Sequence, residues 1–304
     1  YMSNTASTGD LTINAANTEG GTHGIYAKNY GTGALGITTT GTTTGGVDGI
    51  KAANYFGTGA LSITTTGTTT GGVNGIKAVN SGGGALSITT TGTTTGTSRS
   101  GIDAYDDDTG SIIIRTTGTT TGRTSGIDAS NSGGGALSIT TTGTTTGETD
   151  NGIRATNRQY YDYARVTSLT INATDTTGET QGIFADNDGT GALSITTTGT
   201  TKGTSSRGIN ANNSTAGTSL TINAEATTGT QGIYAKNFGT GALEITTTGT
   251  TTGTSSNGIS AINSTAGTSL TINAATTTGG VFGIYADNEG TGALSITTSG
   301  TTTG

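Results

Sequence analysis

A short motif, Gly-Ile-x-Ala-x-Asn, recurs along the 304-residue chain and constrains its fold more than any other feature. Successive copies lie 24 to 30 residues apart, and each is followed by a second motif of the form Leu-x-Ile or Ile-x-Ile. A repeat of this length over a whole chain is typical of solenoids, in which each repeat packs on its neighbours. The eleven copies begin at Gly24, Gly49, Gly75, Gly101, Gly126, Gly152, Gly182, Gly208, Gly232, Gly258 and Gly283.

Each repeat is expected to form three short strands. Ile25 and Ala27 share one face of the first strand, which is the period-two alternation of β-structure. Leu35 and Ile37 share a face of the second strand, and the β-branched run Thr42–Thr44 favours a third. One repeat buries too few apolar groups to offset the entropy of ordering it, so the repeats must stack as coils.

We therefore predict an all-β fold: a single-stranded parallel β-helix (β-solenoid) of about 12 coils of 24–26 residues, whose handedness the repeat alone does not fix. Twelve coils at the spacing of paired strands give a rod of about 58 Å. The whole of residues 1–304 is expected to form this one domain. The core columns are expected to begin with Ile25/Ile50/Ile76, Ala27/Ala52/Ala78, Leu35/Leu61/Leu86 and Ile37/Ile63/Ile88.

Composition excludes several other classes of protein. Thr and Gly, at 80 and 56 residues, account for 136 of 304 positions, and only 29% of residues are hydrophobic, too few for a conventional layered core. A net charge of −7 argues against nucleic acid or anionic membranes as partners. No apolar run approaches the roughly 20 residues of a membrane span, so we expect no membrane insertion by this segment. The absence of Cys excludes disulfides and thiolate sites.

The last position of the Gly-Ile motif is Asn in ten copies and Asp106 in the eleventh. Stacked coils would bring these side chains into a ladder at one corner, where amide groups can satisfy the backbone of the turn. A local distortion is expected at Asp106. The predicted structural ladder consists of Asn29, Asn54, Asn80, Asn131, Asn157, Asn187, Asn213, Asn237, Asn263 and Asn288.

Serial Gly-Ile-x-Ala-x-Asn units followed by Gly-Ala-Leu-Ser-Ile-Thr-Thr resemble the right-handed β-helix passenger domains of Gram-negative autotransporters. The resemblance covers essentially the whole chain. It implies the right-handed coil, export, display outside the outer membrane, and often adhesion or contact with a host. The translocating barrel, signal peptide and release junction of that family are not found in the sequence.

The two ends of the sequence lack amphipathic caps. The chain opens within the repeat pattern and closes on Thr301-Thr302-Thr303-Gly304, where another Gly-Ile strand is due. We expect the segment to be an excerpt of a longer chain, or its ends to pair with neighbouring molecules, because uncapped solenoid ends are open sheet edges.

Two acidic residues suggest an alternative, enzymatic interpretation. Asp103 and Asp128 occupy the same outward position on successive repeats, about 5 Å apart, which suits a retaining glycosidase. The structural interpretation is favoured, because Lys77 and Arg154 flank the pair and compensate its charge. A flat face is also expected to give no desolvation that would raise the pKa of an acid.

The largest irregularity is an insertion after Gly152 that gathers aromatic and basic residues. Loops on rigid scaffolds often carry function, and Tyr and Arg dominate binding hot spots. The alternative is a tolerated insertion whose rings pack on the coil beneath. The candidate binding residues are Arg158, Tyr160, Tyr161, Tyr163 and Arg165.

Three weaker patterns are interpreted structurally. Outward Thr pairs such as Thr38/Thr40 resemble the face of ice-binding solenoids, but Arg115 and other residues interrupt the array. The run Asp106–Asp108 could offer oxygen ligands to Ca²⁺, although a solvated turn is favoured. His23 is expected at the surface. Because it is the only His, the sequence excludes His-based triads and zinc clusters. No metal site and no cofactor are predicted.

The function favoured by the sequence is non-enzymatic: an exported, cell-surface or secreted adhesin or extended spacer. The alternative is a self-assembling extracellular filament formed by end-to-end association, and a polysaccharide-active enzyme or an ice-binding protein is less favoured. By analogy with the family, the expected partner is a glycan or protein on a host or neighbouring cell. The expected location is the outer-membrane surface of a Gram-negative bacterium or the medium outside it.

Overall fold

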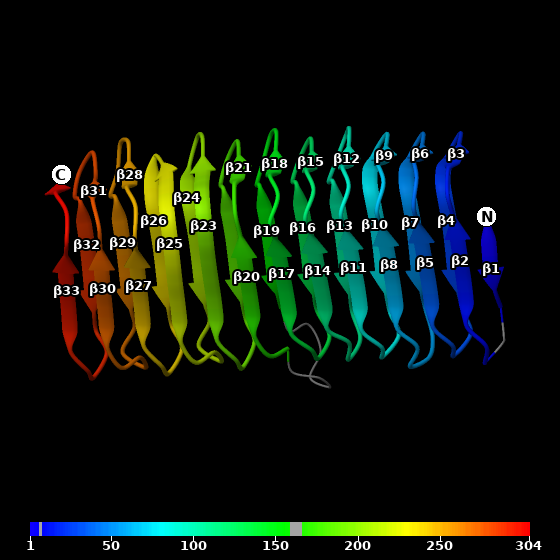
Figure 1. Ribbon diagram of the computed structural model, residues 1–304. Coiled ribbons are helices and arrows are strands. Elements are labelled where there is room, and N and C mark those ends of the chain that lie inside the picture. The colour runs from blue at the N-terminus through cyan, green and yellow to red at the C-terminus, as the bar shows by residue number, and fades with distance from the viewer. Residues whose placement is uncertain (6–7, 159–165) are drawn as a thin grey trace.

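A computed structural model describes residues 1–5, 8–158 and 166–304. Within these ranges the regular elements are 34 strands, and no described segment forms a helix, let alone one able to cross a membrane. All strand pairings among the described residues are parallel, and the strands belong to two sheets. Figure 1 shows the coils following one another in chain order from the N-terminus to the C-terminus. The predicted all-β solenoid of about twelve coils is confirmed.

Sheet A contains β1 and then the eleven Gly-Ile strands, one from each coil, in unbroken order. In the described residues its strands are β1 (Met2–Asn4), β4 (His23–Asn29), β7 (Asp48–Asn54), β10 (Asn74–Asn80), β13 (Ile102–Asp106), β16 (Ile127–Asn131), β19 (Ile153–Asn157), β22 (Ile183–Asn187), β24 (Arg207–Asn213), β26 (Gln231–Asn237), β29 (Ile259–Asn263) and β32 (Ile284–Asn288).

Sheet B contains the other two strands of each coil. The Leu-x-Ile strands are β2 (Leu11–Ala15), β5 (Leu35–Thr39), β8 (Leu61–Thr65), β11 (Leu86–Thr90), β14 (Ile112–Thr116), β17 (Leu137–Thr141), β20 (Leu169–Ala173), β23 (Leu193–Gly203), β25 (Leu220–Gly229), β27 (Leu243–Thr247), β30 (Leu270–Ala274) and β33 (Leu294–Thr298). The Thr-rich strands are β3 (Thr18–Gly20), β6 (Thr43–Gly45), β9 (Thr69–Gly71), β12 (Thr94–Gly96), β15 (Thr120–Gly122), β18 (Thr145–Gly147), β21 (Thr176–Gly178), β28 (Thr251–Gly253), β31 (Thr277–Thr278) and β34 (Thr302–Thr303). Strands β23 and β25 run through both positions without a break.

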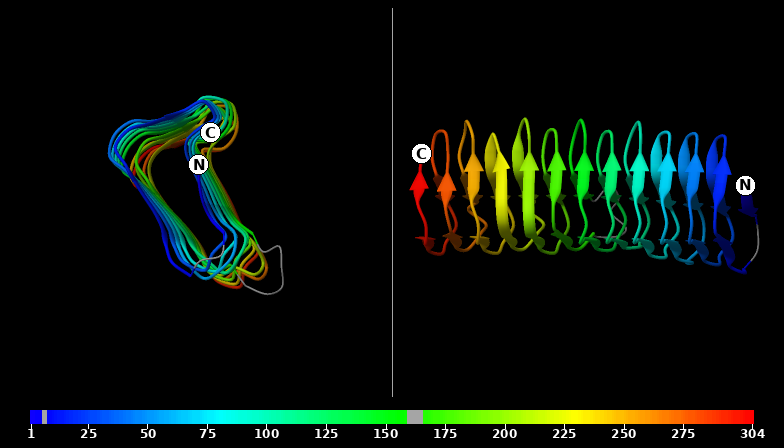
Figure 2. Two further views of the ribbon diagram at one scale, coloured as in Figure 1. Left: turned by 90° about the vertical axis from the view of Figure 1, so that its right-hand side faces the viewer. Right: turned by 45° about the horizontal axis from the view of Figure 1, so that its top comes forward.

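The register places identical side chains on one another in successive coils. Ile50 pairs with Ile76, and Leu61 pairs with Leu86. These columns are fully buried through the middle of the rod, with Ile76 and Ala78 at 0% exposure. Figure 2 shows, in its view along the rod, that the coils lie over one another around one narrow interior. The predicted core columns are therefore confirmed.

Glycine in the Gly-Ile motif is required by close packing. A Cβ added to Gly49 would lie 2.7 Å from the carbonyl oxygen of Gly75 and 2.8 Å from the methyl group of Thr69. Thr69 is itself buried at 0% exposure, so its methyl group fills the space that a side chain at Gly49 would need. The high Gly and Thr content thus reflects a coil too narrow for two large side chains at this corner.

Candidate functional site

The asparagines of the predicted ladder stand in one column at the turn that leads from sheet A to sheet B. Among the described residues, seven Asn side chains donate from Nδ2 to the Oδ1 of the Asn in the next coil, over 2.8 to 3.0 Å. The same amide also bonds the turn backbone: Asn29 Nδ2 donates to the carbonyl oxygen of Gly33 at 2.7 Å, and Gly31 N donates to Asn29 Oδ1 at 3.1 Å. The column therefore fixes the turn in each coil and links it to the next.

Removal of one member should be costly because several buried groups lose partners together. Asn237 donates to Asn263 and to the Gly241 carbonyl, and accepts from Asn213. We expect Asn237→Ala to lower the free energy of unfolding by about 3 kcal/mol, as measured by denaturant titration. The matched control is Asn223→Ala, on the exposed face of sheet B, which should change it by less than about 0.5 kcal/mol. Equal effects of the two substitutions would contradict a structural role for the ladder.

The ladder changes at Asp106, as the sequence predicts. Asn80 Nδ2 donates to Asp106 Oδ2 at 2.7 Å, and Asp108 N donates to Asp106 Oδ1 at 3.1 Å. A carboxylate has no hydrogen to donate onward, and Asn131 bonds its own turn, through Gly133 and Gly135. Burial raises the pKa of Asp106 to about 7, with the hydrogen bonds from Asn80 and Asp108 opposing the shift. The side chain is 0% exposed, so its ionisation state bears directly on stability.

The outward face of sheet A holds the acidic pair considered for catalysis. Register places Asp103 beside Asp128 on adjacent coils. Lys77 Nζ lies 2.8 Å from Asp103 Oδ2, and Arg154 Nη1 lies 2.9 Å from Asp128 Oδ1. The four residues form one row in which the two neighbouring carboxylates are flanked by a cation at each end. The expectation that this face gives no desolvation was wrong, because burial raises the pKa of Asp128 while Arg154 opposes the shift.

Of the five residues proposed as a binding loop, only Arg158 belongs to the described part of the chain. Its Nη2 lies 3.1 Å from Asp186 Oδ2, on the coil above. Its backbone N donates to the carbonyl oxygen of Asn131, so the chain still follows the coil at this point. Tyr160, Tyr161, Tyr163 and Arg165 lie outside the described residues. Val166, the next described residue, is fully buried.

Two further predictions concerned single sites. His23 was expected at the surface, but its side chain is only 11% exposed, and its Nδ1 lies 3.3 Å from Asp48 Oδ2. Burial lowers the pKa of His23, against the attraction of Asp48. The surface prediction for His23 was wrong because His23 begins strand β4, where it packs against Asp48 of the next coil and the Tyr26 ring, 4.9 Å away between ring centres. In the described ranges, no group of three or more His, Cys, Asp or Glu side chains is arranged to hold a metal ion.

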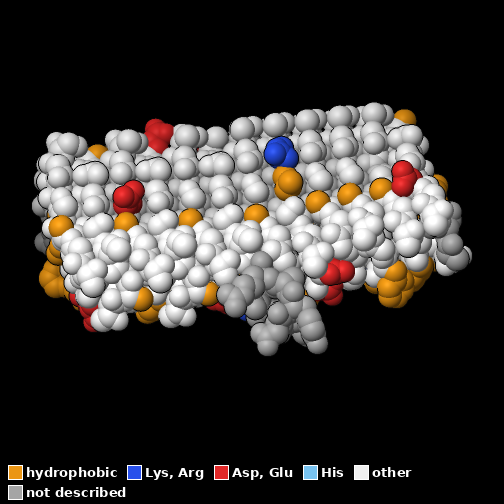
Figure 3. All heavy atoms as spheres, turned by 90° about the horizontal axis from the view of Figure 1, so that it is seen from below, with side chains coloured by type: hydrophobic (Ala, Val, Ile, Leu, Met, Phe, Trp, Pro, Cys, Tyr) orange, Lys and Arg blue, Asp and Glu red, His pale blue; other side chains and the backbone are white. Residues whose placement is uncertain are grey.

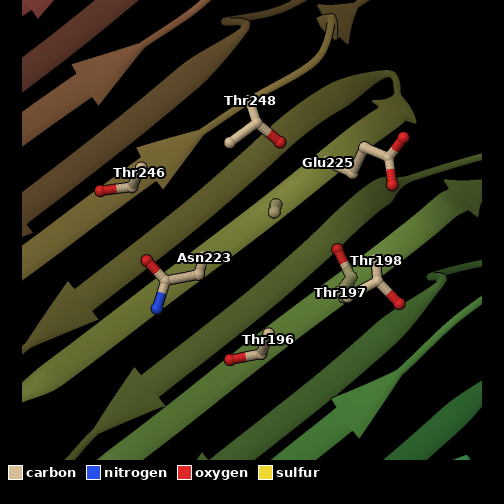
Figure 4. Close-up of a pocket in the computed structure, with 8 residues that line it drawn as sticks. Thr196, Thr197, Thr198, Asn223, Glu225, Thr246 and Thr248 are labelled. Atoms are coloured by element: carbon tan, nitrogen blue, oxygen red, sulfur yellow. The ribbon is translucent and has the colours of Figure 1, made fainter.

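The outward face of sheet B is a plane of hydroxyl groups with few charges. Figure 3 shows it as largely uncoloured, with isolated acidic and basic side chains. A shallow hollow of about 260 Å³ lies on this face (Figure 4), where Thr196, Asn223 and Thr246 form one row across three strands. Glu225 stands in the neighbouring row, between Thr198 and Thr248. The exposed carboxylate of Glu225 can accept hydrogen bonds from water or sugar hydroxyls, and it interrupts the array of Thr side chains.

Sequence reasoning missed two clusters of aromatic and basic side chains on the outward face of sheet A. In the first cluster, Lys28 and Lys51 each have Nζ 5.2 Å from the centre of the Tyr26 ring, and Tyr30 stacks on Tyr55 with 5.0 Å between ring centres. In the second cluster the Arg207 guanidinium lies 4.1 Å, and Lys236 Nζ 5.1 Å, from the centre of the Tyr234 ring.

The signal for these clusters was present in the sequence. Residues 24–35 and 232–243 read Gly-Ile-Tyr-Ala-Lys-Asn-[Tyr/Phe]-Gly-Thr-Gly-Ala-Leu and differ only at Tyr30 and Phe238. Comparison of whole repeats, including their outward positions, would have found the pair.

Comparisons of the chain with models of protein families, with curated proteins and with solved structures find no match in any of the three.

Proposed function

We propose that this chain is a non-enzymatic exported repeat protein, displayed on the surface of a Gram-negative bacterium or released from it, where it serves as an adhesin or rigid spacer. Its repeats resemble those of autotransporter passenger domains, which act in this way. The partner is a glycan or protein on a host or neighbouring cell.

The observation that carries the proposal is the stacking of like coils along the whole described chain. Each coil repeats the cross-section of the last, with the same inward columns and the same parallel register. Such a rod extends by about 4.8 Å per coil and presents two long flat faces, which suits reach and repeated contact better than enclosure of a small substrate. The Asp103–Asp128 row supports the same proposal, because each carboxylate is engaged by a cation from a neighbouring coil.

The enzymatic alternative retains one favourable observation, the raised pKa of Asp128, and has a direct test. Purified protein is incubated with a panel of acidic polysaccharides, and new reducing ends and unsaturated products are measured. We expect no product above that of a boiled sample. Turnover that disappears in Asp103→Asn and Asp128→Asn, but persists in the control Asp107→Asn, would overturn the non-enzymatic proposal.

Adhesion is tested with beads coated with the protein. We expect these beads to bind epithelial or bacterial cells more than beads coated with albumin do, and free protein to compete. Failure on every cell type, at saturating coating density, would remove adhesion and leave the spacer role.

Self-assembly into filaments is the second candidate, favoured by the last coil. Leu294 and Ile296 are 48% and 46% exposed there, whereas the equivalent Leu270 and Ile272 are fully buried. A further coil laid on β33 would cover both. In this candidate function a second copy of the protein supplies that coil. Light scattering across a hundredfold range of concentration decides: a constant monomer mass excludes the filament, and growth with concentration supports it.

A further inference from the structure

On the outward face of sheet A, the described basic side chains fall into two groups. Lys77, Arg154 and Arg158 each lie within 3.1 Å of an Asp carboxylate. The remaining four lie over tyrosine rings instead, and no carboxylate lies within 4.0 Å of them among the described residues. These four are Lys28, Lys51, Arg207 and Lys236. Their positive charge is therefore available to a ligand, on a protein whose net charge is −7.

Each cluster contains one exposed aromatic ring, Phe56 or Phe238. The N-terminal cluster consists of Tyr26, Lys28, Tyr30, Lys51, Tyr55 and Phe56. Phe56 is 63% exposed, and the position above Tyr55 on the next coil is the small Ser81. Hydrophobic side chains gather at the corresponding edge of Figure 3, toward the N-terminal end.

The C-terminal cluster, which consists of Arg207, Tyr234, Lys236 and Phe238, is open in the same way. Phe238 is 39% exposed. The residues that stack on Phe238 from the two neighbouring coils are small: Ser214 on one side and Ser264 on the other. Backbone hydrogen bonds set this register, since Phe238 N donates to the carbonyl oxygen of Asn213 and Ser264 N donates to that of Asn237. Ser260 lies beside Tyr234 on the next coil. Phe238 therefore has no large side chain over it from either neighbouring coil and can stack on a ligand, whereas the Tyr234 ring is in contact with Arg207 and Lys236.

We infer that the two clusters form a bipartite binding site for an anionic polysaccharide, whose sugar rings stack on the aromatic side chains while its carboxylate or sulfate groups pair with the lysines and Arg207. The inference rests on the proposed function and names the class of partner. Exposed aromatic rings and adjacent cations are the groups that combine apolar stacking with charge pairing. Strands β4 and β26 lie eight coils apart in sheet A, so the clusters are about 38 Å apart along the rod.

A sugar polymer is favoured over single-stranded nucleic acid by the residues between the clusters. Asp107, Asp108 and Asp188 lie along the same side of the rod with no cation within 4.0 Å among the described residues. A chain with a phosphate at every residue would be repelled along this path, whereas a polysaccharide can carry fewer charges. The two clusters then act together, because a chain held at one cluster has a high effective concentration at the other.

The test measures binding of the intact 304-residue protein to four immobilised polymers: hyaluronan and lightly sulfated dextran, which both carry fewer than one charge per sugar, neutral dextran and oligo-dT. We expect binding to one or both anionic polysaccharides, weakened by salt, and none to neutral dextran. The relative affinity for the two identifies carboxylate or sulfate as the preferred group. Chains longer than about 38 Å should bind at least tenfold more tightly than shorter fragments.

Variants assign the binding to the clusters. Lys28→Gln with Lys51→Gln, and separately Tyr234→Ala with Phe238→Ala, should each weaken binding of long chains at least tenfold. Lys202→Gln removes the same kind of charge from the exposed face of sheet B and should change affinity less than twofold. Tyr30→Phe keeps the ring and should retain binding, which separates lost contact from lost folding. Circular dichroism checks each variant.

Several outcomes overturn the inference: no binding to either anionic polysaccharide, equal binding of all variants and Lys202→Gln, or tighter binding of oligo-dT. If these occur while protein-coated beads still bind cells, the polysaccharide site is wrong and the adhesin proposal stands. If the polysaccharides bind through the clusters but the beads bind no cell, the site stands and adhesion is wrong.

Discussion

Replacement of Ile139 with Asp should lower the free energy of unfolding by more than about 4 kcal/mol, the largest effect that we expect from a single substitution. Ile139 is fully buried, and it stacks between Ile114 and Ile171 in the middle of the rod. An aspartate there would bury a charge with no cation within reach in the apolar column. Because each coil contacts only its neighbours, the damage should be local and should divide the rod into two parts.

Limited proteolysis followed by mass spectrometry measures this directly. Cleavage of the Ile139→Asp protein should concentrate in the coils around residues 112–171, and thermal unfolding should become broader. Thr140→Asp is the matched control, because this neighbouring side chain points outward from the same strand and is partly exposed. It should change stability by less than about 0.5 kcal/mol. Equal sensitivity at 139 and 140 would contradict the assigned inward and outward faces.

Substitution of Asp106 by Asn should have the opposite sign and stabilise the protein by about 2–4 kcal/mol at pH 8. Asp106 pairs in register with Asn80 below and Asn131 above, and it is fully buried. An amide would remove a buried charge and supply the N–H that the ladder lacks toward Asn131. The magnitude follows from about 1.4 kcal/mol for each unit by which burial raises the pKa of Asp106.

The pH dependence of the free energy of unfolding independently checks the prediction that Asp106→Asn is stabilising. The pKa of Asp106 is about 7 in the folded protein and about 4 in the unfolded chain, so the folded state holds the proton more tightly. The protonated Asp106 carboxyl therefore stabilises the folded state fully below about pH 4, and this stabilisation is lost as pH rises from about 4 to about 7. Denaturant titrations of the unsubstituted protein should show falling stability across this window. Asp106→Asn should flatten the curve, whereas Asp107→Asn, in the same turn, should reduce the slope only slightly, because burial raises the pKa of Asp106 more than the charge of Asp107 does. A slope that survives Asp106→Asn would assign the titration to another group.

Most of the fold could be predicted because each residue type in the repeat has one clear physical role. The alternation of Ile25 and Ala27 with Tyr26 and Lys28 defines the two faces of a strand, and repetition of that pattern defines what lies above and below. Asn at the end of each Gly-Ile strand indicated the corner column in the same way. The prediction depended on period and side-chain type, both of which are readable along a single chain.

The environment of individual polar groups could not be predicted, because it depends on neighbours from different coils. Asp128 was expected to be exposed on a flat face, yet packing of adjacent coils desolvates it and raises its pKa. His23 begins strand β4, just before the Gly-Ile motif, and its side chain meets Asp48 of the next coil and the ring of Tyr26. The aromatic clusters were missed because Lys28 and Lys51 meet the Tyr26 ring from different coils.

Distances between pairs of spin labels test the stacked rod most directly. The chain has no Cys, so introduced cysteines at Thr38, Thr140 and Thr246 can be labelled without interference. These positions lie in one outward column, with Thr140 four coils and Thr246 eight coils from Thr38. Parallel coils in register predict mean distances of about 19 Å for the Thr38–Thr140 pair and about 38 Å for the Thr38–Thr246 pair. Equal mean distances for the two pairs, or a Thr38–Thr246 distance shorter than the Thr38–Thr140 distance, would contradict a single continuous solenoid.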